Sequence, residues 1–273
     1  MSISTADFSF VADMVRQRSA IDLQPGKEYL VEARLAPVAQ TSGMATLGAL
    51  IGRLRRGDAK LCDAVVDALT TNETLWFRDG VPFQAFTRYL LPEMAKSSPD
   101  GRLVIWSAAC SSGQEAYSLA MLLLDWLPAN PGFDARVIGT DISNQMVERA
   151  RAGVYTQLEI DRGAEPYLNR HFSPSGRNWV LRKQVRDLVT FSWGNLALPP
   201  VGMPLCDIIF LRNVLIYFDP ATKRRVIDHA RSVLRPGGFL VLGGAESVPS
   251  LGPGWQRRDL DRAVVFQHTG GTS

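Results

Sequence analysis

One stretch decides the fold of this chain, and it runs Leu103-Val104-Ile105-Trp106-Ser107-Ala108-Ala109-Cys110-Ser111-Ser112-Gly113-Gln114-Glu115-Ala116-Tyr117-Ser118. An apolar run leads into a turn of small residues, and the carboxylate of Glu115 then opens a helical pattern. This order predicts a buried strand, a tight turn and the start of a helix. In an open α/β sheet, a nucleotide-type ligand meets exposed backbone N–H groups at such a junction.

Apolar strands and helical patterns alternate from residue 102 onward. Strands are predicted at 102–107, 135–140, 188–193, 206–212, 238–243 and 262–267, and helices at 113–126, 143–151, 164–171 and 220–234. Near-continuous apolar strands separated by helices predict an α/β fold with a mostly parallel, Rossmann-like sheet that is covered on both faces. Segment 172–187, which contains Pro174 and Gly176, breaks the pattern and predicts a small inserted β-subdomain.

The chain before this domain has a different pattern. Apolar residues recur at helical spacing around Val11, Ile51 and Val65, so residues 1–70 are predicted to form a small all-helical domain. Residues 71–101 are predicted to form a connector with a lid helix, which would begin at an N-cap cluster at 70–73. Thr74 and Arg78, four residues apart, would share one face of that helix. The α/β domain would then cover 102–273.

Bulk composition excludes several classes of protein. The 273 residues are 46% apolar and 21% charged, and the formal net charge of +3 is too small to indicate nucleic-acid binding. Cys62, Cys110 and Cys206 are spaced for neither a zinc site nor a disulfide framework, which favours a reducing, cytoplasmic location without a metal. No apolar run approaches the roughly 20 residues of a membrane helix, so direct membrane insertion is not expected.

The first turn indicates which kind of ligand the site could take. The turn after the strand at 102–107 contains one glycine, Gly113, whereas a dinucleotide-binding turn needs three glycines with the spacing G-x-G-x-x-G. A ligand without phosphates, such as S-adenosylmethionine, needs fewer close backbone approaches. Glu115 could accept a hydrogen bond from an amine or a hydroxyl, or it could simply complement the helix dipole. Asp141, at the end of the second strand, could bind a ribose or act as a helix N-cap.

Three further positions carry polar groups beside this edge of the sheet. Asn195-Leu196 follows the third strand and could contact an adenine edge, although Asn after a strand is often simple turn chemistry. Arg212 follows Leu211 at the end of the apolar fourth strand, where an unpaired charge would be costly. Arg78 could supply a guanidinium to the crevice, or it could lie on a solvated helix face.

Taken together, these motifs resemble a known family. The match runs from about residue 8 to 267 and rests on Thr70-Thr71-Asn72-Glu73-Thr74, Phe77-Arg78, Trp106-Ser107-Ala108-Ala109, Ser112-Gly113-Gln114-Glu115-Ala116-Tyr117-Ser118, Thr140-Asp141-Ile142, Asn195-Leu196 and Phe210-Leu211-Arg212-Asn213-Val214-Leu215-Ile216-Tyr217-Phe218. Their combination resembles the chemotaxis receptor glutamate methyltransferases, the CheR family.

The resemblance implies a class I methyltransferase that moves a methyl group from S-adenosylmethionine to receptor glutamates and releases S-adenosylhomocysteine. It implies a cofactor site lined by Asn72, Thr74, Arg78, Glu115, Asp141, Asn195, Leu196, Leu211 and Arg212. Arg78 and Tyr217 would flank the transferred methyl. Asp141 would hold the ribose, Glu115 would face the ammonium group, and Arg212 would face the carboxylate or a neighbouring loop.

The implied partner is the cytoplasmic helical region of a methyl-accepting chemotaxis receptor. Some family members also bind a C-terminal receptor pentapeptide on the β-subdomain, but the loop at 172–179 lacks the usual glycine-rich hairpin, so no such tether is expected. The basic run Arg53-Leu54-Arg55-Arg56 with Lys60 could meet the acidic receptor, or it could be a solvated face. Gly243-Gly244-Ala245-Glu246 replaces a Gly-His-Ser-Glu type sequence, which leaves a polar contact there in question.

Other functions stay open at this point. The chain could methylate another protein or a small-molecule carboxylate, or it could bind the cofactor without catalysis and regulate a partner. Retention of both Arg78 and Tyr217 argues against a regulator. Nucleic-acid amino methyltransferases carry an Asn/Asp-Pro-Pro-aromatic sequence after the fourth strand, whereas this chain has Arg212-Asn213-Val214-Leu215. Nucleic acid is therefore not an expected partner.

Overall fold

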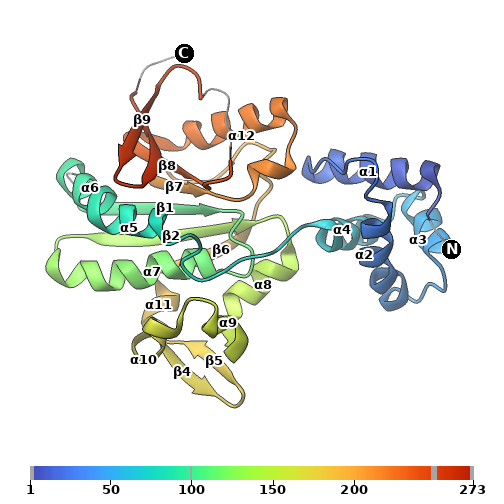
Figure 1. Ribbon diagram of the computed structural model, residues 1–273, viewed down its shortest axis with the longest axis horizontal. Coiled ribbons are helices and arrows are strands. Elements are labelled where there is room, and N and C mark those ends of the chain that lie inside the picture. The colour runs from blue at the N-terminus through green and yellow to red at the C-terminus, as the bar shows by residue number, and fades with distance from the viewer. Residues whose placement is uncertain (1–2, 99, 247–250, 271–273) are drawn as a thin grey trace. The chain divides into compact units, whose positions relative to one another are not determined.

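The computed structural model describes residues 3–98, 100–246 and 251–270 (Figure 1). These residues form two compact units. The N-terminal unit holds the described residues up to Thr71 together with Tyr217–Thr222, and the larger unit holds the rest. The larger unit is therefore built from two chain segments, Asn72–Ile216 and the residues from Lys223 onward.

Four helices form the N-terminal unit: α1 (Thr5–Ser19), α2 (Glu28–Thr41), α3 (Leu47–Leu54) and α4 (Ala59–Leu69). Side-chain oxygens of Ser4, Thr46 and Asp58 cap the first turns of α1, α3 and α4 by accepting backbone N–H groups. The apolar stripes predicted around Val11, Ile51 and Val65 are buried in the common core. The prediction of an all-helical N-terminal region is confirmed.

A seven-stranded sheet forms the centre of the larger unit. Its strands are β1 (Arg102–Ala108), β2 (Asp134–Asp141), β6 (Val189–Trp193), β7 (Cys206–Leu211), β8 (Leu234–Leu242), β9 (Trp255–Leu260) and β10 (Ala263–His268). The order is β6-β2-β1-β7-β8-β10-β9, with parallel pairing from β6 to β8 and antiparallel pairing at β10 and β9. The predicted mostly parallel sheet is confirmed. The β9 edge strand was not predicted, because its sequence WQRRDL has no buried residue and hence no apolar signal.

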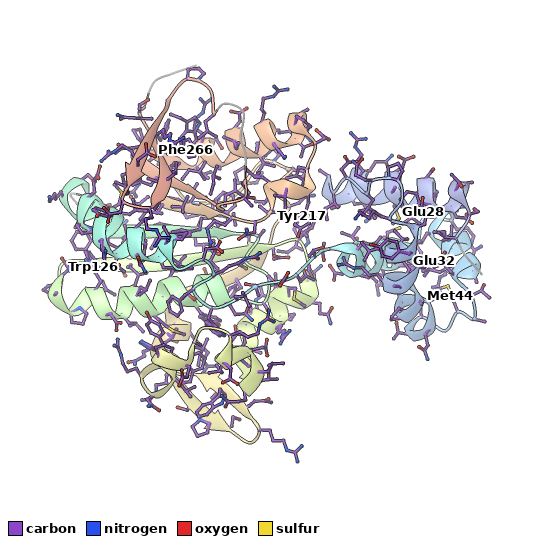
Figure 2. All side chains as sticks on the ribbon, viewed as in Figure 1. Glu28, Glu32, Met44, Trp126, Tyr217 and Phe266 are labelled. Atoms are coloured by element: carbon purple, nitrogen blue, oxygen red, sulfur yellow. The ribbon has the colours of Figure 1, made fainter. Side chains whose placement is uncertain are left out.

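Helices cover both faces of this sheet (Figure 1). Helices α7 (Gln114–Trp126) and α8 (Asn144–Ala152) lie on one face, and α12 (Pro220–Ser232) lies on the other. The right-handed crossover rule accounts for this, because the chain moves outward in opposite directions from the central pair β1 and β7. Trp126 marks the end of α7 (Figure 2). Both α7 and α12 start at the carboxyl ends of parallel strands, where ligands bind in such sheets.

The connector differs from the sequence prediction. Residues 71–80 are not helical, because Phe77 and Asp79 have φ angles of 46° and 69°, which an α-helix cannot accommodate. Thr70 is the C-cap of α4 and not part of an N-cap cluster. The prediction that Thr74 and Arg78 share a helix face is therefore wrong.

The helix of the connector begins later, at Val81. It runs as α5 (Val81–Ala85), a π-helical turn η1 (Phe86–Leu90) and α6 (Leu91–Ser97). Pro92 lies just beyond the π-helical turn. Because Pro92 has no N–H, it cannot donate to the carbonyl four residues earlier, and this favours the wider turn.

A small β-subdomain spans residues 154–181. It contains β3 (Val154–Thr156), α9 (Gln157–Asp161), the 3-10 turn η3 (Glu165–Tyr167), α10 (Leu168–His171), β4 (Phe172–Ser175) and β5 (Asn178–Leu181). The three strands pair antiparallel in the order β3-β5-β4. The subdomain therefore begins earlier than 172, because its first strand has only three residues and was too short to recognise in the sequence.

Candidate active site

The turn after β1 has an unusual backbone. Ala109, Ser111 and Gly113 have φ angles of 61°, 50° and 94°, so three left-handed residues occur within five positions and only one is glycine. A Cβ on Gly113 would lie 3.0 Å from the Cβ of Ala150 on α8, which explains the glycine at this position. Backbone strain of this kind persists only where the surroundings hold it, and it clusters at functional sites.

Asp141 is one of the groups that hold this turn. The Ser111 N–H donates to Asp141 Oδ2 at 2.7 Å, and the Ser143 N–H donates to Oδ1 at 2.9 Å. Ser143 is the N-cap of α8, since its hydroxyl accepts the Met146 N–H at 3.2 Å. The N-cap alternative for Asp141 is therefore wrong. The buried Asp141 carboxylate instead joins the turn after β1 to the end of β2.

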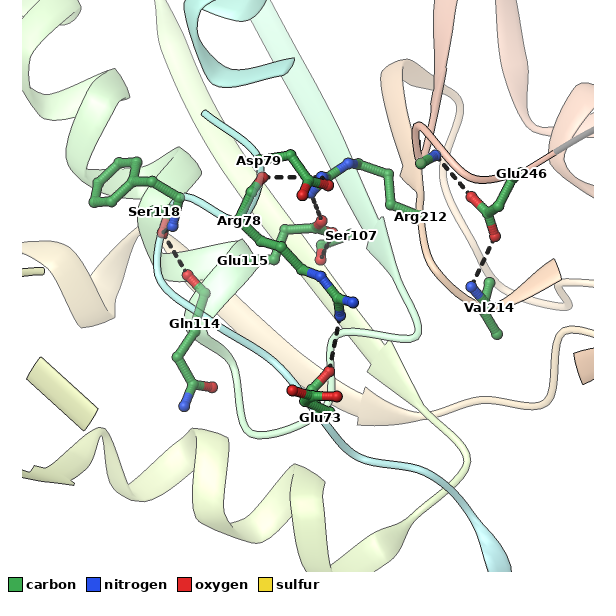
Figure 3. Close-up of polar contacts among 12 residues, drawn as sticks. Glu73, Arg78, Asp79, Ser107, Gln114, Glu115, Ser118, Arg212, Val214 and Glu246 are labelled. Atoms are coloured by element: carbon green, nitrogen blue, oxygen red, sulfur yellow. Dashed lines mark hydrogen bonds and ion pairs between the residues drawn. The ribbon is translucent and has the colours of Figure 1, made fainter. Parts of the chain in front are cut away.

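Arg212, directly after β7, lies at the centre of a second polar cluster (Figure 3). Its side chain is 0% exposed, and it pairs with Glu115 on α7 and with Asp79 on the connector at 2.8 Å each. Nη2 also donates to the backbone carbonyl of Arg78 at 2.9 Å. Ser107 on β1 donates to the other oxygen of Glu115 at 2.8 Å. The guanidinium thus faces both Glu115 and the loop that carries Arg78.

Arg78 lies on the turn that Arg212 holds. Its Nη1 donates to the carbonyl of Glu73 at 3.1 Å, so the side chain reaches back along the connector (Figure 3). The Ser111 hydroxyl donates to the Asn72 carbonyl at 2.8 Å. These contacts place the segment from Asn72 to Arg78 across the turn that follows β1. They depend on backbone atoms and the tertiary fold, and not on helical spacing.

Two of the cavities that adjoin these clusters are lined in part by the predicted cofactor-site residues. The smaller, about 170 Å³, is lined by Asn72, Thr74, Ser112 and Gln114 among others. The larger, about 620 Å³, is lined mainly by apolar groups, and its walls include Asn195, Leu196 and Leu211. A cavity of this size falls within the ordinary range for small-molecule sites.

Asn195 also has a local structural role. Its Oδ1 accepts the Ala197 N–H at 3.0 Å, which is the turn chemistry that the sequence left open. This bond shapes the loop after β6 at the wall of the larger cavity. The turn role does not exclude a ligand contact from the same side chain.

Tyr217 belongs to the N-terminal unit, with the other residues of Tyr217–Thr222. It ends the 3-10 turn Leu215–Tyr217, its side chain is half-buried, and its carbonyl accepts the Asp22 N–H at 3.1 Å. Its place in the reaction stays a prediction.

Sequence reasoning missed three polar residues of these clusters: Asp79, Ser107 and Glu246. A signal existed for Ser107, because it is a polar residue at the end of an apolar strand, and for Asp79, because it adjoins Arg78. Glu246 accepts the N–H groups of Val214, Leu215 and Gly243 at 2.7–2.8 Å and ties the loop after β7 to the loop after β8 (Figure 3). Glu246 is common to Gly243-Gly244-Ala245-Glu246 and the Gly-His-Ser-Glu type sequence, so its contacts do not replace those of the histidine and serine.

The described residues also indicate the state of the Cys110 thiol and the distribution of potential metal ligands and apolar helices. Burial, followed by the charges of Asp141 and Glu115, raises the pKa of the Cys110 thiol well above its ordinary value, so it is not a thiolate at neutral pH. No group of three potential metal ligands occurs in 3–98, 100–246 and 251–270. None of the helices described has the length and apolarity needed to cross a bilayer.

Comparison with protein families places the chain. Residues 72–261 match the model for the CheR methyltransferase SAM-binding domain, and residues 6–70 match the model for the CheR methyltransferase all-alpha domain. The chain belongs to the CheR methyltransferase family. The family's SAM-binding domain thus covers both polar clusters and both cavities, and its all-alpha domain covers helices α1 to α4.

Full-length relatives agree with this family assignment. The chain is 37% identical to chemotaxis protein methyltransferase 1 of Pseudomonas aeruginosa over 98% of this chain and 99% of that protein. It is 41% identical to the chemotaxis protein methyltransferase of Vibrio parahaemolyticus over 98% of each, and 31% identical to that of Escherichia coli over 92% and 87%.

The residues present fit S-adenosylmethionine, the ligand of this family domain. Asp141 and Glu115 supply two carboxylates around the turn after β1, which suits a ligand with hydroxyl, ammonium and sulfonium groups. The apolar cavity beside Asn195 and Leu196 has room for a flat aromatic ring. The absence of a glycine-rich phosphate cradle fits a ligand that carries no phosphate.

Proposed function

We propose that this protein transfers a methyl group from S-adenosylmethionine to glutamate side chains of chemotaxis receptors, forming methyl esters for sensory adaptation. The observation that carries the proposal is the attachment of the Arg78 turn to the end of β7 by Arg212, at 2.8 Å to Asp79 and 2.9 Å to the Arg78 carbonyl. This attachment keeps a guanidinium-bearing residue at the carboxyl ends of the strands, where the family's ligand binds.

The reaction depends more on how the reacting groups are positioned than on proton transfer. A glutamate carboxylate is already ionised at neutral pH, so the protein needs no strong general base. S-adenosylmethionine, when bound, supplies an electrophilic methyl group on a positively charged sulfur. Arg78 orients the incoming carboxylate, because a guanidinium fork matches the two oxygens of a carboxylate. Exclusion of water then favours the cancellation of opposite charges.

We assign the cofactor site to nine residues: Asn72, Thr74, Arg78, Glu115, Asp141, Asn195, Leu196, Leu211 and Arg212. Asp141 would hold the ribose and Glu115 the ammonium group. The neighbourhood of Asn195, Leu196 and Leu211 at one cavity supports an adenine pocket there. Arg212 acts through its contacts to Glu115 and the Arg78 turn, and Tyr217 is proposed to bound the methyl group.

The proposed receptor contact is the basic run of the N-terminal unit. Arg53 pairs with Asp58 and Arg55 pairs with Asp7, whereas Arg56 and Lys60 form no salt bridge with the residues described. Double charge reversal at Arg56 and Lys60 should reduce receptor methylation, while Lys27→Glu in the same unit serves as the control. Equal methylation by both variants would show that this basic run does not contact the receptor. The cytoplasm is the proposed location, consistent with three free buried cysteines.

We further propose that the β-subdomain does not bind a receptor pentapeptide. Its strands β4 and β5 are joined through Gly176 and Arg177 alone. The sheet has two edge strands, β3 with only three residues and β4, which contains Pro174 and so lacks one N–H for an added strand. Calorimetry with the C-terminal pentapeptide of a receptor should give no heat of binding, and micromolar affinity would contradict the proposal.

The decisive experiment is tritiated methyl transfer to membranes that contain the receptors of the source bacterium, with receptor-free membranes as the control. Counts released as methanol in base support the proposal, because carboxyl methyl esters hydrolyse and methylated amines do not. Base-stable counts would indicate another methyltransferase class. Binding of S-adenosylhomocysteine without any transfer would indicate a regulator. Either of these outcomes overturns the proposal.

A further inference from the structure

Two aromatic residues come directly before Arg78 on the connector, and both pack on the β-subdomain. The Trp76 side chain is buried, with 3% exposure for the residue. Its ring meets Tyr155 edge to face at 4.8 Å and Phe172 at 5.3 Å between centroids. Tyr155 is on β3 and Phe172 is on β4, so the subdomain forms the pocket for this indole.

Phe77 is held in the same way. Its ring stacks on Tyr167 of the subdomain, with centroids 4.2 Å apart and planes 19° apart. Its N–H donates to the Ser118 hydroxyl on α7 at 3.1 Å. Phe77 has a φ of 46°, a conformation that is unfavourable for a bulky residue and that persists only when its neighbours enforce it.

The backbone of the subdomain also fits closely against the connector. Gly163 has a φ of +122°, and a Cβ at this position would lie 2.6 Å from the Trp76 carbonyl oxygen. The Tyr155 hydroxyl donates to the Ser112 carbonyl at 2.7 Å, which joins the subdomain to the turn after β1. These contacts fix the subdomain against both segments of the proposed site.

Arg78 is therefore held from two directions. The subdomain fixes Trp76 and Phe77 on its N-terminal side, and Arg212 fixes the Arg78 carbonyl and Asp79 on its C-terminal side. A turn held at both ends loses less conformational entropy when the substrate is oriented. Displacement of such a group by an ångström can lower a reaction rate by about 100-fold.

We infer that the β-subdomain of this protein is a clamp for the Arg78 turn, with Tyr155, Gly163, Tyr167 and Phe172 as positioning residues for methyl transfer. The inference rests on the proposed function of Arg78. It assigns to the subdomain a role in catalysis that needs no receptor peptide, and it gives a role to β3, which carries Tyr155, beside the short β4–β5 hairpin.

The test is removal of one stacked ring. Tyr167→Ala should lower kcat for receptor methylation by roughly 10- to 100-fold, while the Kd for S-adenosylhomocysteine changes by less than about twofold. Amide hydrogen exchange at Phe77 should accelerate, because the variant frees the turn. Tyr167→Phe keeps the ring and should restore both values. Trp179→Ala, in the same subdomain with its Nε1 bonded to Gln157, is the control and should retain activity.

A double-mutant cycle separates positioning from general damage. In the Arg78→Ala background, Tyr167→Ala should lower the residual rate by less than about twofold, because the clamp acts through Arg78. Additive losses would overturn the clamp and leave the role of Arg78 intact. Full activity of Arg78→Ala would overturn the proposed role of Arg78 itself. If Tyr167→Ala does not fold, Tyr167→Leu retains apolar packing without the stacked ring and carries the same expectations.

Discussion

Arg212 donates a hydrogen bond to the Asp79 carboxylate at 2.8 Å, although 133 positions of sequence separate the two residues. Arg212 follows β7, and Asp79 follows the turn that presents Arg78. The same guanidinium pairs with Glu115 on α7 at 2.8 Å. One buried cation thus joins the two ends of the proposed site, and several consequences can be measured.

Arg212→Ala should destabilise the protein by about 3–5 kcal/mol, because it leaves the Glu115 carboxylate without its partner at a site shielded from water. Urea unfolding followed by circular dichroism measures this loss. Arg257→Ala is the matched control, since Arg257 pairs with Asp259 on the surface at 2.9 Å. Its effect should stay below about 1 kcal/mol. Equal losses for the two variants would show that the Arg212 network contributes no special stability.

Arg78→Ala should lower turnover by about 100-fold and cofactor affinity by much less, because the guanidinium is expected to act mainly by orienting the acceptor carboxylate. Receptor methylation and calorimetry with S-adenosylhomocysteine separate the two effects. Arg177→Ala, on the β4–β5 connection, provides a control of the same type. Wild-type transfer by the Arg78 variant would remove this residue from the mechanism.

Asp141→Asn should weaken binding of S-adenosylhomocysteine by about tenfold or more, because a carboxamide nitrogen would face one of the N–H groups of Ser111 and Ser143. Isothermal calorimetry gives the change in Kd. Asp134→Asn, an exposed position at the opposite end of the same strand, should leave Kd unchanged. A wild-type Kd for the Asp141 variant would exclude it as a cofactor ligand.

His171 predicts a pH dependence of folding. Burial, followed by the charges of Arg170 and Arg182, lowers the pKa of His171 to about 4. The unfolded chain, with an ordinary pKa near 6.5, binds a proton first as pH falls. The contribution of the neutral His171 to the free energy of unfolding is therefore complete above about pH 6.5. It is lost progressively as the pH falls toward 4.

His171→Phe should flatten this dependence. Both ring nitrogens of His171 are buried without a hydrogen-bond partner, so an apolar ring of similar size should not destabilise the fold at pH 7. Between pH 6.5 and 4 the slope of unfolding free energy against pH should be smaller by up to about 1.4 kcal/mol per unit, the value for one proton. Identical slopes for the two proteins would show that His171 does not titrate differently on folding.

Local pattern predicted much of the fold. The apolar run that starts at Leu103 predicted the first strand, because a parallel strand buried on both faces must be apolar throughout. The small residues that follow, up to Gly113, predicted the turn. The burial argument applies also to the strand near 206–212, which is buried at every position of β7. The connector was misassigned, because helical spacing of Thr74 and Arg78 says nothing about the positive φ angles of Phe77 and Asp79. Those angles are imposed by packing, which no local pattern records.

Residue types and their order thus established the α/β class, the helical N-terminal part and the family, because these depend on short-range periodicity and on motifs that are contiguous in the chain. Only the tertiary structure decided what each charged group contacts. Arg212 meets Asp79 and Glu115 because β1, β7 and the connector converge at one edge of the sheet. The tertiary structure also brings Tyr167 against Phe77, although their residue numbers differ by 90. Aromatic stacking depends on distance in space and not on separation along the chain.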